Sequence, residues 1–483
     1  MDDTRPSRGS GLRPDVARRF GVDFLRADDD AVRTGGGAVR TGGESVPIGD
    51  DAVPIGDDAE RAGGGADRMD ADTVRFGVDS VRANPPGRFL SGCWGMVTND
   101  AARCAMDAGL LSRRALLDAG VALTRLFSPE HGITRFGADG EAMVDGTDPV
   151  TGLPVCSLYG DTMRPPAELL AGLDGVIFDI PDIGSRFYTY IWTLSHVMEA
   201  CADAGRPLVV LDRVNPLGGD ISATEGPVLD VARCGSFLGR APVPVRHGLT
   251  AGEFALWLAS HWRLGLDLEV VPAQGWNRRM QWPDCGLPFV PTSPAIPSFE
   301  SALCYPGTCL FEAANISIGR ETERPFQVIG APWMGKAETS FEKAISAGFI
   351  LPDRAGGLCY RSPELPGVRF RDVEFVPGIE PWKGQLCRGI RLEVTDRAAF
   401  RPVRTGLALM AIIRRQYPDE FRWRTYPTAA NPTGEGHFER LIGVTDIRPL
   451  LEKDPAALIR SLPGRLDTSA WQKEITPFLC YPK

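Results

Sequence analysis

The 483-residue sequence lacks any apolar stretch of the length that a membrane-spanning helix requires. Such a helix needs about 20 consecutive apolar residues, whereas the longer apolar runs here, such as residues 175–178 and 208–211, have the length of strands. The sequence also lacks a charged and then apolar segment after Met1, which predicts that it carries no secretory signal. We therefore expect a soluble, cytoplasmic protein with no membrane partner.

Paired cysteines and an excess of basic residues are also missing. The number of cysteines, 11, is odd and no Cys-x-x-Cys pair occurs, which argues against a disulfide framework or a zinc ribbon. The five histidines show no metal-ligand spacing, so we expect no metal. The formal net charge of −9 argues against a general affinity for nucleic acid.

The short motifs of several large enzyme classes are absent from the sequence. There is no Gly-x-Ser-x-Gly elbow, no Walker A sequence, no His-Glu-x-x-His and no Gly-x-Gly-x-x-Gly after the first predicted strand. Serine hydrolases, nucleotide hydrolases, zincins and dinucleotide-dependent enzymes are therefore poorly supported. We expect a protein that uses no cofactor.

Residues 1–73 differ in composition from the rest of the chain. They are rich in Gly, Asp, Ala and Arg and nearly free of aromatic residues, so they cannot bury enough apolar surface to offset the entropy of ordering. The pentapeptide Arg-Phe-Gly-Val-Asp at 19–23 recurs at 75–79, just before the first predicted strand. We predict that residues 1–73 form a disordered extension and that the folded part begins at residue 74.

From residue 74 onward, short apolar runs alternate with helical patterns. Apolar runs without polar alternation suit parallel strands that are buried on both faces. We therefore predict a Rossmann-like, doubly wound parallel sheet in an α/β domain at 74–295, followed by a smaller mixed α/β domain at 296–483. The predicted strands are 95–98, 121–127, 175–180, 208–211, 266–271, 368–376 and 389–394, and the predicted helices are 112–119, 188–204, 250–262 and 405–416.

Polar residues follow each of the first four predicted strands. Right-handed crossovers place the carboxyl ends of parallel strands along one edge of the sheet, where ligands bind in such folds. We expect these residues to converge there, although any one cluster is equally consistent with helix capping. The clusters contain Asn99 after the first strand, Glu130 and His131 after the second, Asp182 and Arg186 after the third, and Arg213 and Asn215 after the fourth.

Glu130 is the leading candidate for a general acid. It stands in a Pro-Glu-His-Gly sequence that can continue neither a strand nor a helix, and a carboxyl group on such a turn can deliver a proton if it is buried. A helix-capping carboxylate is the alternative. Glycoside hydrolysis usually needs a second carboxylate, and the spacing does not choose among Asp182, Glu225 and Glu312. His247 precedes a predicted helix and either orients a ligand or completes the turn.

A further signal comes from seven segments of the sequence, which are 127–132, 157–160, 178–190, 211–219, 225–227, 246–248 and 315–320. Taken together, these segments resemble the NamZ-type exo-β-N-acetylmuramidase family, long described as a domain of unknown function. The resemblance implies a Rossmann-like domain without a nucleotide, a smaller C-terminal domain and an active-site cleft near their junction. It also implies a glycosidase that removes N-acetylmuramic acid from the non-reducing end of peptidoglycan fragments.

The substrate that the resemblance implies is a small carbohydrate with a lactyl carboxylate. Arginine binds carboxylates in a bidentate manner, so we expect the lactyl group to contact one or more of Arg186, Arg213, Arg246 and Arg320. Any one of these arginines can instead form a structural ion pair. Tyr188 and Tyr190 can stack on a sugar, although packing in the core is the more common role of such residues. The candidate substrate-binding residues are Asn99, His131, Arg186, Tyr188, Tyr190, Arg213, Asn215, Glu225, Arg246, His247, Asn315 and Arg320, and the candidate catalytic residues are Glu130, Asp182 and Glu312.

Two other functions stay open at the level of sequence. A non-catalytic protein that binds muropeptides or sugars would use the same cleft without a competent pair of carboxylates. An enzyme that acts on another sugar or acyl substrate would use the arginines to bind a different anion, such as phosphate.

Overall fold

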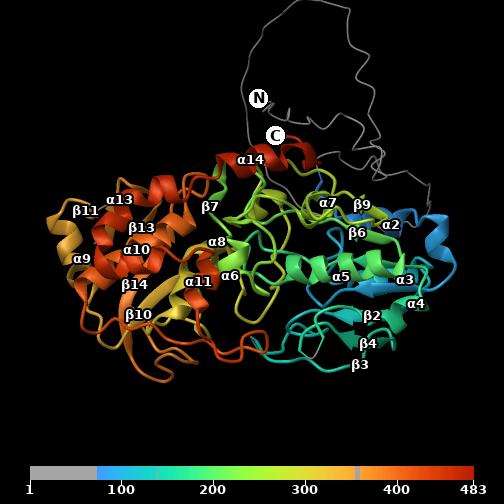
Figure 1. Ribbon diagram of the computed structural model, residues 1–483, viewed down its shortest axis with the longest axis horizontal. Helices are drawn as coiled ribbons and strands as arrows, with labels where there is room; N and C mark the ends of the chain where they lie inside the picture. Colours follow the sequence, from blue (N-terminus) through green and yellow to red (C-terminus); the bar gives the residue numbers. More distant parts are fainter. Residues whose placement is uncertain (1–72, 139, 161, 354–358) are drawn as a thin grey trace, which may run out of the picture.

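The computed structural model describes residues 73–138, 140–160, 162–353 and 359–483, so the predicted disorder of the N-terminal extension concerns residues almost entirely outside the described part. Figure 1 shows two units side by side. The first is built around a mostly parallel sheet, and the second around an antiparallel sheet.

The first sheet has seven strands in the order β3-β4-β2-β1-β5-β6-β9. All neighbours are parallel except β3, which pairs antiparallel with β4 at the edge. Numbered along the chain, the six parallel strands have the order 3-2-1-4-5-6, which defines one kind of doubly wound sheet. The strands are β1 (Trp94–Val97), β2 (Leu123–Ser128), β3 (Gly146–Thr147), β4 (Pro154–Ser157), β5 (Gly175–Phe178), β6 (Leu208–Leu211) and β9 (Leu268–Val271).

The central strands are buried on both faces because their alternate side chains enter two different apolar cores. In β5, Val176 and Phe178 pack into one core, whereas Ile177 packs into the other. Helices α5 and α7 contribute to the first core, and α2 and α3 to the second. The helices of this unit are α2 (Gly77–Ala83), η1 (Gly87–Leu90), α3 (Ser112–Asp118), α4 (Ala167–Ala171), α5 (Tyr190–Ala204), η2 (Ile221–Ala223), α6 (Val231–Cys234), α7 (Ala251–His261) and η3 (Trp282–Cys285).

The second unit is organised by a five-stranded antiparallel sheet in the order β10-β14-β13-β12-β11. Helix α10 packs between α8, α9 and α13, and its buried face joins a core that continues into the first unit. The strands are β10 (Val328–Ala331), β11 (Leu351–Asp353), β12 (Cys359–Ser362), β13 (Leu365–Phe375) and β14 (Cys387–Val394), and a separate pair is formed by β7 (Glu225–Val228) and β8 (Pro244–Arg246).

The remaining helices lie in the C-terminal part of the chain. They are α8 (Phe299–Thr308), η4 (Cys309–Ala313), α9 (Ala337–Ser346), α10 (Pro402–Gln416), α11 (His437–Ile442), α12 (Ile447–Lys453), α13 (Pro455–Arg465), α14 (Ser469–Ile475) and η5 (Thr476–Phe478). The predicted fold class, a doubly wound parallel sheet followed by a second mixed unit, is confirmed.

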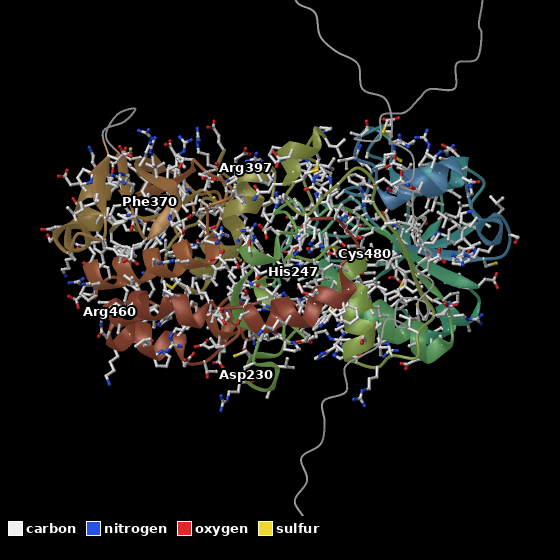
Figure 2. All side chains as sticks on the ribbon, turned by 90° about the horizontal axis from the view of Figure 1, so that it is seen from above. Asp230, His247, Phe370, Arg397, Arg460 and Cys480 are labelled. Carbon is white, nitrogen blue, oxygen red and sulfur yellow. The ribbon has the colours of Figure 1, made fainter. Side chains whose placement is uncertain are left out.

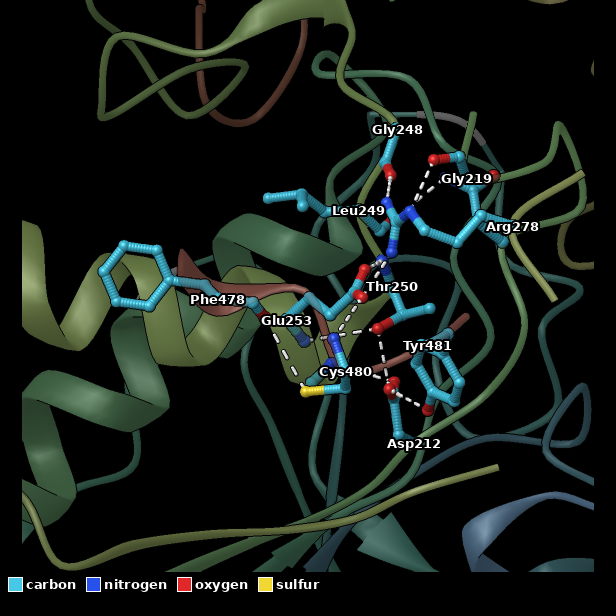
Figure 3. Close-up of polar contacts among 12 residues, drawn as sticks. Asp212, Gly219, Gly248, Leu249, Thr250, Glu253, Arg278, Phe478, Cys480 and Tyr481 are labelled. Atoms are coloured by element: carbon cyan, nitrogen blue, oxygen red, sulfur yellow. Dashed lines mark hydrogen bonds and ion pairs between the residues drawn. The ribbon is translucent and has the colours of Figure 1, made fainter. Parts of the chain in front are cut away.

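The end of the chain returns to the first unit through a buried polar network (Figure 3). The hydroxyl of Tyr481 donates to Asp212 at 2.6 Å, and the backbone N–H of Cys480 donates to Glu253 at 2.8 Å. Glu253 also forms an ion pair with Arg278. The segment after α13 therefore packs on the first unit, although it follows the second unit in sequence. For the rest of the chain, we propose that the boundary between the two units lies near residue 295.

Candidate active site

A cleft of about 740 Å³, open solvent included, lies between the two units. One wall comes from the first unit and contains Glu130, His131 and Tyr188. The second unit contributes another part of the lining, which contains Glu312 and Arg320. Of the residues proposed from the sequence, the structure brings these five together at the cleft.

Glu130 reaches the cleft because a tight turn ends strand β2. His131 has a φ of 67° and Gly132 a φ of 70°, which lie in the left-handed region that most residues other than glycine avoid. The His131 conformation is held by its ring, whose Nδ1 donates to the carbonyl of Gly137 at 2.8 Å. Residues outside the ordinary backbone regions often mark functional sites. The turn thus fixes the position of Glu130 at the end of the strand.

Both carboxylate oxygens of Glu130 accept hydrogen bonds. Its Oε1 accepts the backbone N–H of Gly140 at 2.9 Å, and its Oε2 accepts the hydroxyl of Thr189 at 2.7 Å. Thr189 lies immediately before α5, and the carbonyl of Gly140 accepts the backbone N–H of Ala429 from the second unit at 2.6 Å. Glu130 is 6% exposed. It is therefore a nearly buried carboxyl group in a defined orientation beside the cleft.

Glu312 lies in η4, in the second unit, and contacts two basic side chains. Arg320 donates to its Oε1, and the Nε2 of His437 lies 3.3 Å from its Oε2. The ring of His437 stacks on Tyr426, with centroids 4.7 Å apart and an angle of 15° between the planes. These contacts fix the orientation of the Glu312 carboxylate.

Tyr188 contributes a ring to the cleft wall and has its hydroxyl engaged elsewhere. The hydroxyl donates to the Oγ1 of Thr292 at 2.6 Å, and burial raises the pKa of the phenol. Directly behind it, Asn99 donates to the hydroxyl of Tyr190 at 3.1 Å, and that hydroxyl donates to the carbonyl of Thr292 at 2.9 Å. Asn99 and Tyr190 therefore support Tyr188 and do not line the cleft.

Asp182 and His247 form a separate pair. The Oδ2 of Asp182 accepts the backbone N–H of Gly184 at 2.6 Å and lies 3.5 Å from the Nε2 of His247. His247 is fully buried, and its Nδ1 accepts the backbone N–H of Leu249 at 3.1 Å. Asp182 borders a different, largely apolar pocket, so the structure does not place it with Glu130 and Glu312.

Three of the proposed arginines are engaged by protein groups outside the cleft. Arg213 forms an ion pair with Asp179. Arg246 donates to the carbonyl of Leu217, and its burial lowers the pKa of the guanidinium to about 10. Arg186 is fully buried, which lowers its pKa to about 9, and it donates to the carbonyl of Leu441 in the last turn of α11 as well as to two carbonyls of the first unit. Each of these arginines has a structural role in this arrangement.

The remaining candidates stabilise turns or helix ends. Glu225 accepts the backbone N–H groups of Val403 and Arg404 in the first turn of α10. Asn215 accepts the backbone N–H of Leu217, and Asn315 accepts that of Arg422. None of the three lines the cleft within the described part of the chain.

Several residues at the cleft are not among those proposed from the sequence, and they include Thr189, Tyr426, His437 and Arg440. Thr189 lies inside a segment that carries the family resemblance. His437 follows Gly434 and Gly436, both with positive φ, and so stands on a glycine-defined turn much as Glu130 does. The two closely spaced glycines before His437 are the sequence feature from which this residue could have been proposed.

The comparison with family profiles decides the relationship. The N-terminal profile of exo-β-N-acetylmuramidase NamZ matches residues 94–300, and the C-terminal profile matches residues 303–481. The chain belongs to the NamZ exo-β-N-acetylmuramidase family. The predicted family and the prediction of a glycosidase are thereby confirmed.

The chain is also similar to individual proteins of known sequence or structure. The chain is 39% identical over 360 residues to the peptidoglycan β-N-acetylmuramidase NamZ of Bacillus subtilis, with 74% of this chain and 79% of the relative covered. A crystal structure of a DUF1343 family protein from Bacteroides fragilis matches with a TM-score of 0.71 at 28% identity, covering 85% of this chain and 99% of the other. A second DUF1343 protein from the same organism has the same fold, with a TM-score of 0.62 at 24% identity and the same coverage.

Two features are absent from the residues that the structure describes, 73–138, 140–160, 162–353 and 359–483. No helix there is long and apolar enough to span a bilayer. No group of three or more His, Cys, Asp or Glu side chains in the same residues is arranged to hold a metal ion.

Proposed function

We propose that this chain releases N-acetylmuramic acid from the non-reducing end of peptidoglycan fragments by carboxylate general acid catalysis in the cleft between its two units. The observation that carries the proposal is that two carboxylates from different units, Glu130 and Glu312, line one cleft. Glycoside hydrolysis generally uses two carboxyl groups that flank the scissile bond. The relative from Bacillus subtilis, which is named as a muramidase, supports the choice of sugar.

Glu130 is the proposed general acid. In its protonated form it transfers its proton to the glycosidic oxygen while the bond from that oxygen to the anomeric carbon breaks. The N–H of Gly140 and the hydroxyl of Thr189 hold the carboxyl group through this transfer, and they stabilise the carboxylate that remains after it.

Glu312 is the proposed second carboxylate. It faces the positive charge that develops at the anomeric carbon, and it acts there as a nucleophile, as a base for water or as an electrostatic partner. Arg320 and His437 fix its orientation. Asp182 is the weaker candidate because it borders another pocket. Acid–base hydrolysis by two carboxyl groups needs no cofactor, and we propose none.

The experiment that tests the function compares two chromogenic substrates, an aryl β-N-acetylmuramide and the corresponding aryl β-N-acetylglucosaminide. We expect the full chain to hydrolyse the muramide with a higher kcat/KM than the glucosaminide. Equal rates on the two sugars would contradict the proposed sugar. Saturable binding of the muramide without any hydrolysis would support a non-catalytic binding protein instead.

A further inference from the structure

Two guanidinium groups, those of Arg320 and Arg440, line the cleft, and they differ in what surrounds them. Arg320 donates to Glu312 and lies over the ring of Phe326, with 5.3 Å between the guanidinium carbon and the ring centroid. Arg440 is half-buried, and among the described residues its side chain has no hydrogen-bond or ion-pair partner. A cation in that position is available to an anionic group of a ligand.

The position of Arg440 is set by helix α11. His437, Arg440 and Leu441 lie three and four residues apart, so they share one face of the helix, and all three line the cleft. The buried guanidinium of Arg186 holds the last turn of this helix through the carbonyl of Leu441. Arg440 is therefore displayed on a fixed helix, one turn away from the histidine that contacts Glu312.

We propose that Arg440 binds the lactyl carboxylate of N-acetylmuramic acid and thereby selects this sugar over N-acetylglucosamine. The inference rests on the proposed function and deepens it. The lactyl carboxylate is the charged group that distinguishes the two sugars, and a guanidinium matches a carboxylate with two parallel hydrogen bonds. This assignment takes the place of a lactyl contact by Arg186 or Arg213, whose side chains are engaged by carbonyl groups and by Asp179.

A structural role would have a different signature. Arg440 lies in the last turn of α11, where a positive charge also stabilises the helix dipole. That role predicts a change in stability that is independent of the substrate. Recognition of the carboxylate predicts a loss that depends on whether the substrate carries the charge.

The test measures hydrolysis of two aryl β-N-acetylmuramides, one with a free lactyl carboxylate and one with the carboxylate converted to a carboxamide. Arg440→Gln should lower kcat/KM for the charged substrate about 10- to 100-fold, mainly through KM, because a charge-assisted hydrogen bond is lost. The same variant should hydrolyse the carboxamide as the wild type does. The matched control is Arg460→Gln, an arginine on the outer end of the second unit (Figure 2), which should leave both rates unchanged.

A second readout does not depend on turnover. Free N-acetylmuramic acid should raise the Tm of the wild type more than N-acetylglucosamine does, and Arg440→Gln should abolish the difference. If Arg440→Gln slows both muramides equally, or if the Tm difference persists in this variant, the assignment of Arg440 is overturned while the proposed function stands. A wild-type chain that hydrolyses neither muramide overturns the proposed function and the role of Arg440 together.

Discussion

Two buried polar clusters of this protein contain similar residues and have different surroundings. The first is the network around Asp212, Glu253 and Arg278 (Figure 3), and the second is the group around Glu130 and Glu312. Asp212 accepts four hydrogen bonds, from two backbone N–H groups and two hydroxyls, and it lies inside the first unit. The second cluster borders the open cleft.

The comparison shows what separates a structural polar cluster from a catalytic one. Both clusters lie next to the carboxyl ends of parallel strands, so position in the sheet does not distinguish them. The cluster around Asp212 joins the C-terminal segment to the first unit, and its acceptors are occupied by protein donors. The cluster around Glu130 leaves space beside it for a ligand between two units.

The largest expected effect is on stability, from Glu253→Ala. Removing this carboxylate leaves the buried guanidinium of Arg278 without its partner, which typically costs about 3–5 kcal/mol. The free energy of unfolding in urea measures the loss. Glu374→Ala is the control, because Glu374 pairs with Arg388 at the surface, and its removal should cost less than about 1 kcal/mol. A fall in kcat without a fall in stability would place this network in the active site. It would contradict the distinction between a structural cluster around Asp212 and a catalytic cluster around Glu130.

A smaller effect on rate is expected from His437→Phe. The phenyl ring preserves the stack on Tyr426 but cannot contact Glu312, so kcat should fall roughly 10-fold. Steady-state kinetics, with the Tm measured in parallel, checks this outcome. An unchanged kcat with a lowered Tm would show that the cleft cluster is structural as well.

Asp212 should make stability depend on pH. Burial raises its pKa from 3.8 to about 6, so between these values the folded state holds the proton more tightly than the unfolded state. Its contribution to stability is therefore present at low pH and decreases as the pH rises from about 4 to about 6. Unfolding measurements on the wild type and on Asp212→Asn should show a difference that shrinks over this window. A difference in the free energy of unfolding that stays constant with pH would contradict the raised pKa of Asp212.

The smallest expected effect comes from removing the N-terminal extension. A chain that begins at Thr73 should keep the Tm and the kcat of the full chain, because the composition of the extension gives it little apolar surface to bury. Thermal unfolding of the two chains side by side checks this. A substantially lower Tm for the shorter chain would show that the extension packs on the folded part.

Much of the first sheet is predictable from the sequence because its strands are short, continuous apolar runs. The predicted strand at Leu208–Leu211 has the observed bounds, and the others differ by a few residues at their ends. Strand β4 is missed because it begins at Pro154 and has only four residues. Helix α11 is missed because it has six residues and depends on tertiary contacts such as that of Arg186.

The candidate site is only partly predictable because local sequence does not reveal the partner of a charged side chain. Arg213 follows a strand, as a ligand-binding residue would. Its guanidinium nevertheless forms an ion pair with Asp179 at the end of the neighbouring strand. Conversely, His437 and Arg440 reach the cleft from a distant part of the chain through the packing of α11. Glu130, which was proposed from the sequence, lines the cleft because the turn that carries it is encoded locally. Its catalytic role and the cytoplasmic location stay predictions.

Glu130→Gln tests the central claim most directly, because it preserves the shape of the side chain and removes the proton donor. We expect kcat for a natural muramic acid-containing disaccharide to fall on the order of 10²-fold or more, with the Tm unchanged. An aryl muramide with an acidic leaving group needs little protonation, so its hydrolysis should be much less impaired. Hydrolysis of both substrates at the wild-type rate would show that Glu130 is not the general acid and would contradict the account.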